Sequence, residues 1–150
     1  MGGANLLYTW IDAFSIGAAG ALALTAAAID HRTSRIPNGL TIPFIFLGLA
    51  FLPLRCALTV VGLVCGVSYG FVYGLWRCGL WGGGDAKLVL ALFILVSPAY
   101  PPLLFIVTFS LCLALVLFAK HLLINHNAGP MGPALLLAYV LSISALEVGP

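Results

Sequence analysis

Long apolar runs follow one another along almost the whole chain, and short polar stretches separate them. The runs cover about residues 10–29, 40–54, 57–76, 86–97, 102–119 and 131–148. None alternates with a period of two residues, so the pattern predicts helices and not strands. Because a spanning helix needs about 20 apolar residues, the chain has room for about six spans. We therefore expect an all-α, polytopic transmembrane helix bundle in which residues 1–150 form a single membrane-embedded domain.

The second and fourth runs are short for a full crossing, so each can tilt, thin the bilayer locally or re-enter on the same side. The first run lacks the positively charged residues that precede the apolar part of a cleavable signal peptide. We expect it to be a permanent span.

Composition supports the bilayer as the solvent of this protein. Hydrophobic residues make up 63% of the chain and charged residues 7%, whereas a soluble domain carries about 25% charged residues. There is no basic stripe of the kind that binds nucleic acid. The cysteines show no C-x-x-C spacing, so the sequence predicts neither a metal site nor a redox centre, and no cofactor.

The basic residues lie mostly on one side of the predicted bundle. The loops after the first, third and fifth runs hold Arg32, Arg35, Arg77, Lys87 and Lys120, and the opposite side holds Arg55. Cytoplasmic loops carry the excess of Lys and Arg, which predicts cytoplasmic odd-to-even loops and both termini outside. Aromatic residues near the predicted boundaries are expected at the membrane interface: Tyr8, Trp10, Trp76, Trp81 and Tyr100.

Two of the acidic residues, Asp30 and Asp85, lie where a span meets a cytoplasmic loop. The others, Asp12 and Glu147, lie at the outer ends and are expected to cap or flank helices. An ionisable residue at the edge of a span is a candidate for function. Two structural interpretations remain open: Asp85 as the N-cap of the following helix, and Asp30 as a solvated loop residue paired with a nearby arginine.

Paired carboxylates at one membrane depth are suited to peptide hydrolysis. One acts as a base toward water and the other as an acid toward the substrate, and the two share one proton. Three glycines, Gly82, Gly83 and Gly84, directly precede Asp85. They remove side chains where an extended substrate must approach, and they permit a positive φ in the connecting turn.

The two aspartates occupy opposite ends of their predicted helices. Asp30 ends a helix, where the dipole disfavours a carboxylate, and Asp85 begins one, where the dipole favours it. We therefore predict that Asp85 is the ionised base and that Asp30 holds the shared proton, unless Arg32 and Arg35 cancel this bias.

Three segments in order along the chain resemble the type IV prepilin peptidase family. Asp30 opens a basic, turn-forming stretch that ends in Ile36-Pro37-Asn38, as in the first aspartate motif of that family. The segment 82–88 is similar to its second motif, G-x-G-D with a following lysine, and 129–134 is similar to its C-terminal Pro-x-Gly-Pro segment.

The resemblance implies a helical membrane protein of the bacterial inner membrane with Asp30 and Asp85 as the catalytic pair. It implies cleavage of the basic leader from prepilin or pseudopilin substrates at the cytoplasmic face. The residues implied to shape the site are Gly82, Gly83, Gly84, Pro37 and Asn38. Long members carry an insertion with paired C-x-x-C motifs that binds zinc and is linked to N-methylation. This chain lacks it and resembles the short form found with tight-adherence (Flp-type) pili, which makes methyltransferase activity doubtful. The archaeal preflagellin peptidases share the G-x-G-D chemistry and remain potential relatives.

Two other functions are consistent with the same acids. A small acid-dependent transporter or proton channel would place them near mid-membrane in broken helices, and an inactive assembly subunit would keep the motif without activity. The expected partners are a substrate helix and membrane lipid. A small-residue stripe, Gly62, Gly66, Gly70 and Gly74, predicts close helix packing, either within the chain or against a substrate helix or a second copy.

Overall fold

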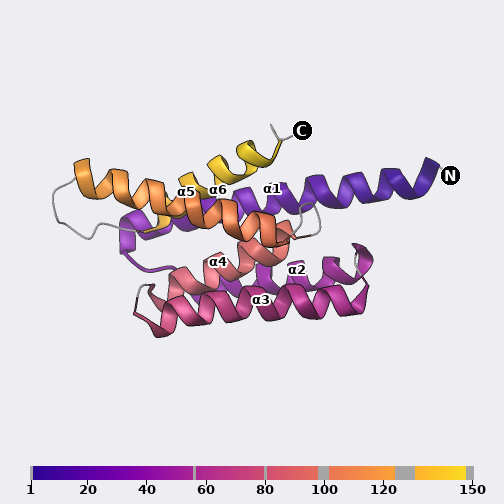
Figure 1. Ribbon diagram of the computed structural model, residues 1–150, viewed down its shortest axis with the longest axis horizontal. Helices are drawn as coiled ribbons and strands as arrows, with labels where there is room; N and C mark the ends of the chain where they lie inside the picture. Colours follow the sequence, from indigo (N-terminus) through magenta and orange to yellow (C-terminus); the bar gives the residue numbers. More distant parts are fainter. Residues whose placement is uncertain (1, 56, 80, 98–101, 124–130, 148–150) are drawn as a thin grey trace.

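The computed structural model describes residues 2–55, 57–79, 81–97, 102–123 and 131–147, and within these ranges it contains helices and no strand (Figure 1). The helices in chain order are α1 (Gly2–Thr33), α2 (Asn38–Arg55), α3 (Leu58–Arg77), α4 (Gly83–Val96), α5 (Pro102–Leu123) and α6 (Gly132–Glu147). Each helix covers one of the predicted apolar runs, so the all-α prediction is confirmed.

Helix α1 ends four residues after the apolar run 10–29 from which it was predicted. The helix continues through Asp30 to Thr33, because the backbone N–H of Ser34 donates to the Asp30 carbonyl at 2.7 Å and closes the last turn. The hydroxyl of Thr33 donates to the carbonyl of Ile29 at 2.9 Å. Ser34 has a φ of 51°, which reverses the chain after the helix. Asp30 therefore belongs to a rigid helical turn and not to a loop.

Helix α4 occupies the centre of the bundle. It packs against α1, α2, α3 and α5, and Figure 1 shows it between α1 on one side and α3 on the other. Its apolar residues are buried around its whole circumference, as expected of a helix surrounded by protein. With 14 residues it is about 21 Å long, shorter than the hydrocarbon core of about 30 Å. The fourth apolar run is therefore short because it forms a helix that other helices of the protein enclose.

Aromatic contacts fix α4 to α3 and α5. The ring of Phe93 lies 6.0 Å from Phe71, 5.7 Å from Phe105 and 5.4 Å from Phe109, measured between centroids. The contacts with Phe105 and Phe109 are edge-to-face, a geometry worth about 0.5–1.5 kcal/mol beyond area burial. Trp81 also belongs to this core, edge-on to Phe71 at 6.3 Å and 9% exposed.

The prediction that Trp81 lies at the membrane interface is therefore wrong. Trp10 and Trp76 are exposed, which agrees with the same prediction for these two residues. The side chain of Tyr8 and the whole of Tyr100 lie outside what the structure describes.

The segments Thr9–Thr33 and Leu58–Arg77 are long and apolar enough to cross a membrane, by length and composition alone. The apolar helices Asn38–Leu54, Leu104–Val116 and Gly132–Leu146 are shorter. The start of α1 and the end of α6 lie toward the same end of the molecule (Figure 1). The span count and the orientation of the termini stay predictions.

The glycine stripe of α3 faces away from the rest of the bundle. A Cβ added at Gly62, Gly66, Gly70 or Gly74 would meet nothing within 4 Å. Packing of this stripe against another described helix of the same chain is therefore wrong. The alternatives, a second copy or a substrate helix, remain open.

Candidate active site

The predicted aspartates line one cavity of about 330 Å³ at one end of the bundle. Asp30 reaches it from the last turn of α1, and Asp85 from the first turn of α4. The remaining lining residues come from the α1–α2 link and from the start of α4: Ser34, Arg35, Ile36, Gly82, Gly83 and Gly84. Residues far apart in the sequence thus meet around one cavity.

Asp30 is almost fully enclosed, with 5% of its surface exposed. Its Oδ2 accepts a hydrogen bond of 2.7 Å from the backbone N–H of Gly132, the first residue of α6. A buried carboxylate needs such partners because it has lost its water. The interpretation of Asp30 as a solvated loop residue is therefore wrong.

Asp85 is the third residue of α4, and Gly82 occupies the N-cap position with φ −69° and ψ 157°. Asp85 is therefore not the N-cap. A backbone hydrogen bond links its carboxylate to Gly82, as a side chain at the third position reaches back in a capping box. A Cβ on Gly82 would lie 3.1 Å from Oδ2 of Asp85, so the glycine leaves space for this carboxylate.

The surroundings of Asp85 disfavour its charge. It lies in the first turn of α4, before the apolar part of the helix. Burial, and then the charge of Asp30, raise the pKa of Asp85 above its usual range, and the backbone bond at Gly82 opposes this in part. This direction opposes the argument from the helix dipole, which counted only the dipole of each aspartate's own helix and omitted burial. Which of the two aspartates holds the shared proton stays a prediction.

The glycines before Asp85 differ in what an added side chain would meet. A Cβ on Gly84 would lie 3.1 Å from the carbonyl oxygen of Ile36, so Gly84 lets the α1–α2 link pass over α4. A Cβ on Gly83 would meet nothing nearer than Nε1 of Trp76 at 3.9 Å. None of the three has a positive φ, which among the described glycines occurs at Gly79. All three glycines line the cavity. That they clear space for a substrate stays a prediction.

Pro37 and Asn38 lie beside the cavity and do not line it. The carbonyl of Pro37 accepts the backbone N–H of Leu40 at 3.1 Å at the start of α2. Oδ1 of Asn38 accepts a hydrogen bond of 2.8 Å from Nζ of Lys87. This bond ties the start of α2 to the first turns of α4.

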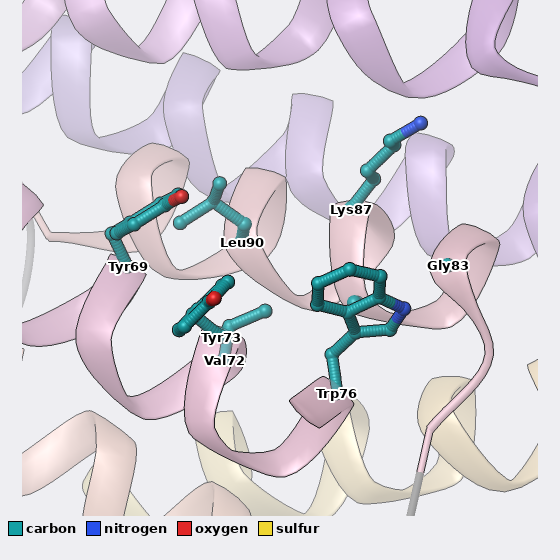
Figure 2. A pocket seen from close by; sticks show the side chains of 8 residues that line it. Tyr69, Val72, Tyr73, Trp76, Gly83, Lys87 and Leu90 are labelled. Atoms are coloured by element: carbon teal, nitrogen blue, oxygen red, sulfur yellow. The ribbon is translucent and has the colours of Figure 1, made fainter. Parts of the chain in front are cut away.

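A second pocket lies on the other side of Gly83, between α3 and α4, with a volume of about 280 Å³ (Figure 2). We call it the aromatic pocket, and its lining residues are Tyr69, Val72, Tyr73, Trp76, Gly83, Ala86, Lys87 and Leu90. The ring centroids of Tyr69 and Tyr73 lie 5.8 Å apart, and those of Tyr73 and Trp76 lie 5.7 Å apart. Gly83 lines both pockets, so the two are neighbours.

Comparison with known proteins assigns the chain to a family. A model of the type IV leader peptidase family matches residues 17–119, a range that contains both aspartates. The chain belongs to the type IV leader peptidase family. This confirms the resemblance seen in the aspartate motifs. One curated relative is the prepilin leader peptidase/N-methyltransferase of Vibrio cholerae serotype O1, 27% identical over 148 residues. The alignment covers 93% of this chain and 58% of the relative, so the chain spans less than two thirds of the relative's length. No solved structure gives a significant match.

Two contacts near the aspartates could not be predicted from the sequence. The position of Gly132 within the Pro-x-Gly-Pro segment was noticed, but nothing local shows that its N–H meets Asp30. The sequence places Lys87 among the inside-positive charges and after the G-x-G-D motif, but it does not predict the bond to Asn38, which joins the two motifs. His31 is exposed and outside the cavity lining.

Within the described residues no group of His, Cys, Asp and Glu side chains is arranged to hold a metal ion. His126 and the side chain of His121 lie outside that part of the chain.

Proposed function

We propose that this chain is a prepilin leader peptidase in which Asp30 and Asp85 act as a catalytic pair. The observation that carries the proposal is their convergence on one cavity from the ends of two helices, in a chain of the type IV leader peptidase family. The curated relative bears the name of such a peptidase. A transporter or proton channel has less support, because the aspartates lie at helix ends and not in mid-helix breaks.

The chemistry requires one proton on the pair. The ionised carboxylate takes a proton from a water molecule as the water oxygen attacks the peptide carbonyl carbon. The protonated carboxyl donates to the carbonyl oxygen. When the C–N bond breaks, a proton passes to the departing amine, which leaves an acid and an amine as products. Because the two carboxyls interact, they titrate as a unit.

The aromatic pocket supplies a place for the apolar part of the substrate. It adjoins the catalytic cavity through Gly83, and Ala86 and Lys87 directly follow Asp85 along α4. A pocket of about 280 Å³ with tyrosine and tryptophan walls accommodates a large apolar side chain. We place here an apolar residue of the prepilin segment next to the scissile bond.

Location follows from the same proposal. We infer a multi-pass protein of the bacterial inner membrane, with the aspartate cavity at the cytoplasmic face. Arg32 and Arg35 directly follow Asp30, and Lys87 follows Asp85, which agrees with the excess of positive charge on cytoplasmic segments.

The test is cleavage of a prepilin-like substrate, with a basic leader before an apolar helix, that is co-expressed with this chain and followed by mass. Asp30→Asn and Asp85→Asn are each expected to lower the cleavage rate by about 10²–10⁴-fold, the usual contribution of a positioned acid or base. Asp12→Asn is the matched control, because Asp12 lies on α1 but not in the cavity.

Wild-type protein that is folded in detergent and cleaves none of several such substrates would overturn the proposal. Proton flux through reconstituted protein that is lost in both aspartate variants would then support the channel function. The absence of both activities would favour the inactive subunit.

A further inference from the structure

Trp76 lies in the last turn of α3, and its position there is fixed. Its backbone carbonyl accepts the N–H of Gly79 at 3.0 Å, where the helix ends. Its ring packs against that of Tyr73, with 5.7 Å between the ring centroids. The side chain is nevertheless 46% exposed and forms part of the wall of the aromatic pocket. Trp76 is thus held in place while part of its ring stays open.

The indole N–H of Trp76 borders the junction of the two cavities. Gly83 lines both the aspartate cavity and the aromatic pocket. Outside its own helix and its chain neighbours, a Cβ on Gly83 would meet one described atom within 4 Å, and this atom is Nε1 of Trp76 at 3.9 Å. Figure 2 shows the indole nitrogen on the edge of the ring that is turned toward Gly83. A hydrogen-bond donor therefore lies where the two cavities meet.

This arrangement suits a backbone carbonyl of a bound peptide. A carbonyl oxygen that lies about 1 Å nearer to the ring than the added Cβ would be about 2.9 Å from Nε1, the usual length of a hydrogen bond. An indole N–H can only donate, and a peptide carbonyl that leaves water for an apolar pocket needs a donor.

Lys87 has the other side-chain nitrogen in the lining of the aromatic pocket. Its Nζ already donates to Oδ1 of Asn38 at 2.8 Å, and Figure 2 shows this nitrogen turned away from Trp76. Of the two nitrogens, that of Trp76 is therefore the one directed at the junction.

We infer that Trp76 is a substrate-binding residue: its indole N–H donates to a backbone carbonyl of the prepilin chain, where that chain passes over Gly83 from the aspartate cavity into the aromatic pocket. This inference rests on the proposed function. The carbonyl is that of the first residue after the scissile bond, because the scissile carbonyl itself lies at the aspartates and the chain then enters the pocket. The hydrogen bond holds the substrate backbone beside the bond that is cleaved.

The kinetic test removes the N–H and keeps the shape of the ring. Benzothienylalanine, in which sulfur replaces the N–H of the indole, is introduced at position 76, and Trp76→Phe is a second variant without the donor. Each should raise KM for the prepilin-like substrate by about 10-fold, which corresponds to about 1.4 kcal/mol. The value of kcat should stay near that of the wild type, because the bond is present before and during the reaction. Trp10→Phe is the matched control, since Trp10 is an exposed tryptophan of α1 outside the pocket, and it should leave KM unchanged.

A double-mutant cycle tests whether Gly83 and Trp76 act on the same carbonyl. Gly83→Ala puts a Cβ into the space assigned to the carbonyl oxygen, and the protein itself accommodates this Cβ without a clash. Gly83→Ala alone should also raise KM by about 10-fold. Combined with benzothienylalanine at position 76 it should raise KM little further, because both changes remove one and the same bond.

A nuclear magnetic resonance measurement tests the bond without requiring activity. The indole N–H signals are recorded in Asp85→Asn, and the signal of Trp76 is assigned by its loss when Trp76→Phe is added. A synthetic prepilin-like peptide should move the indole proton signal of Trp76 downfield and leave that of Trp10 in place. A peptide with an ester in place of the first peptide bond after the scissile one should cause a smaller shift, because an ester carbonyl is the weaker acceptor.

An unmoved Trp76 signal with a peptide that the wild type cleaves would overturn the inference. An unchanged KM in the benzothienylalanine variant would do the same, and so would independent effects of about 100-fold in the double variant or an equal rise of KM in Trp10→Phe. Absence of cleavage by the wild type would instead overturn the peptidase function, so the two failures are distinguishable.

Discussion

Asp85 shows how a site residue departs from what its local sequence predicts. A carboxylate in the first turn of a helix is stabilised by the dipole, yet burial and the charge of Asp30 raise the pKa of Asp85. The dipole acts within one turn, whereas burial is the sum of everything packed around the residue. At this residue burial has the larger effect.

The raised pKa makes the stability of the protein depend on pH. An aspartate has an ordinary pKa of about 3.9 in an unfolded chain. Because the folded value is higher, the native state binds the proton more tightly, and stability falls as pH rises from the unfolded value through the folded one. We expect Asp85→Asn to unfold at a higher temperature than the wild type at pH 7, with the difference shrinking as the pH falls toward 4.

The difference in unfolding temperature between Asp85→Asn and the wild type is measured by thermal unfolding in detergent at a series of pH values. A wild type that is the more stable of the two at pH 7, by a margin that grows with pH, would contradict the expectation.

At the scale of elements, α4 is held on one side by a close approach of α2. A Cβ on Gly48 would lie 2.7 Å from Cγ2 of Ile94 and 3.2 Å from its backbone carbonyl carbon. Gly48→Ala should therefore destabilise the protein by about 1–3 kcal/mol, the usual cost of overpacking. Gly66→Ala, on the open face of α3, should be neutral or stabilising because alanine favours helix over glycine by about 1 kcal/mol. Denaturant or thermal unfolding distinguishes the two variants, and equal stability would show that α2 and α4 are less tightly packed.

The aromatic pocket is a feature of α3 and α4 together. We expect Tyr73→Ala to raise KM for a prepilin-like substrate with a large apolar residue beside the scissile bond, by about 10-fold for 1.4 kcal/mol of lost contact. It should leave kcat near the wild-type value, since Tyr73 lies outside the aspartate cavity.

Tyr69→Ala tests the far wall of the same pocket, and Leu63→Ala, exposed on α3 beyond it, is the control. An unchanged KM in both tyrosine variants would mean that the pocket does not bind the substrate.

At the scale of the whole molecule, the aspartate cavity lies at one end of the bundle, where α1 ends and α4 and α6 begin. The ends of α1 and α3 carry basic residues. If this end faces the cytoplasm, Cys78, exposed after α3, should react with a membrane-impermeant thiol reagent in inside-out vesicles and not in intact cells.

The experiment uses a variant in which the other cysteines are replaced by serine or alanine. Leu58→Cys in a variant without Cys78 is the control, because Leu58 is exposed at the opposite end of α3; it should react in intact cells. Labelling of Cys78 from outside would reverse the proposed orientation.

The helices themselves were predictable from the sequence, because apolar runs of sufficient length admit few other structures and their ends are marked by charge, proline or glycine. The two aspartates were also found, since each follows or precedes such a run in a recognisable motif. Their convergence was inferred only through membrane depth and family resemblance.

Other features depended on contacts between distant segments. That α4 is enclosed by its neighbours, that Gly84 makes room for Ile36, and that Gly132 donates to Asp30 are all long-range facts. By itself the sequence determined which segments are helical and which residues carry the acids, because both follow from local chemistry. Only the tertiary structure decided where α6 begins relative to Asp30 and how deeply Asp85 is buried, and the difference between the two carboxyls depends on these distant contacts.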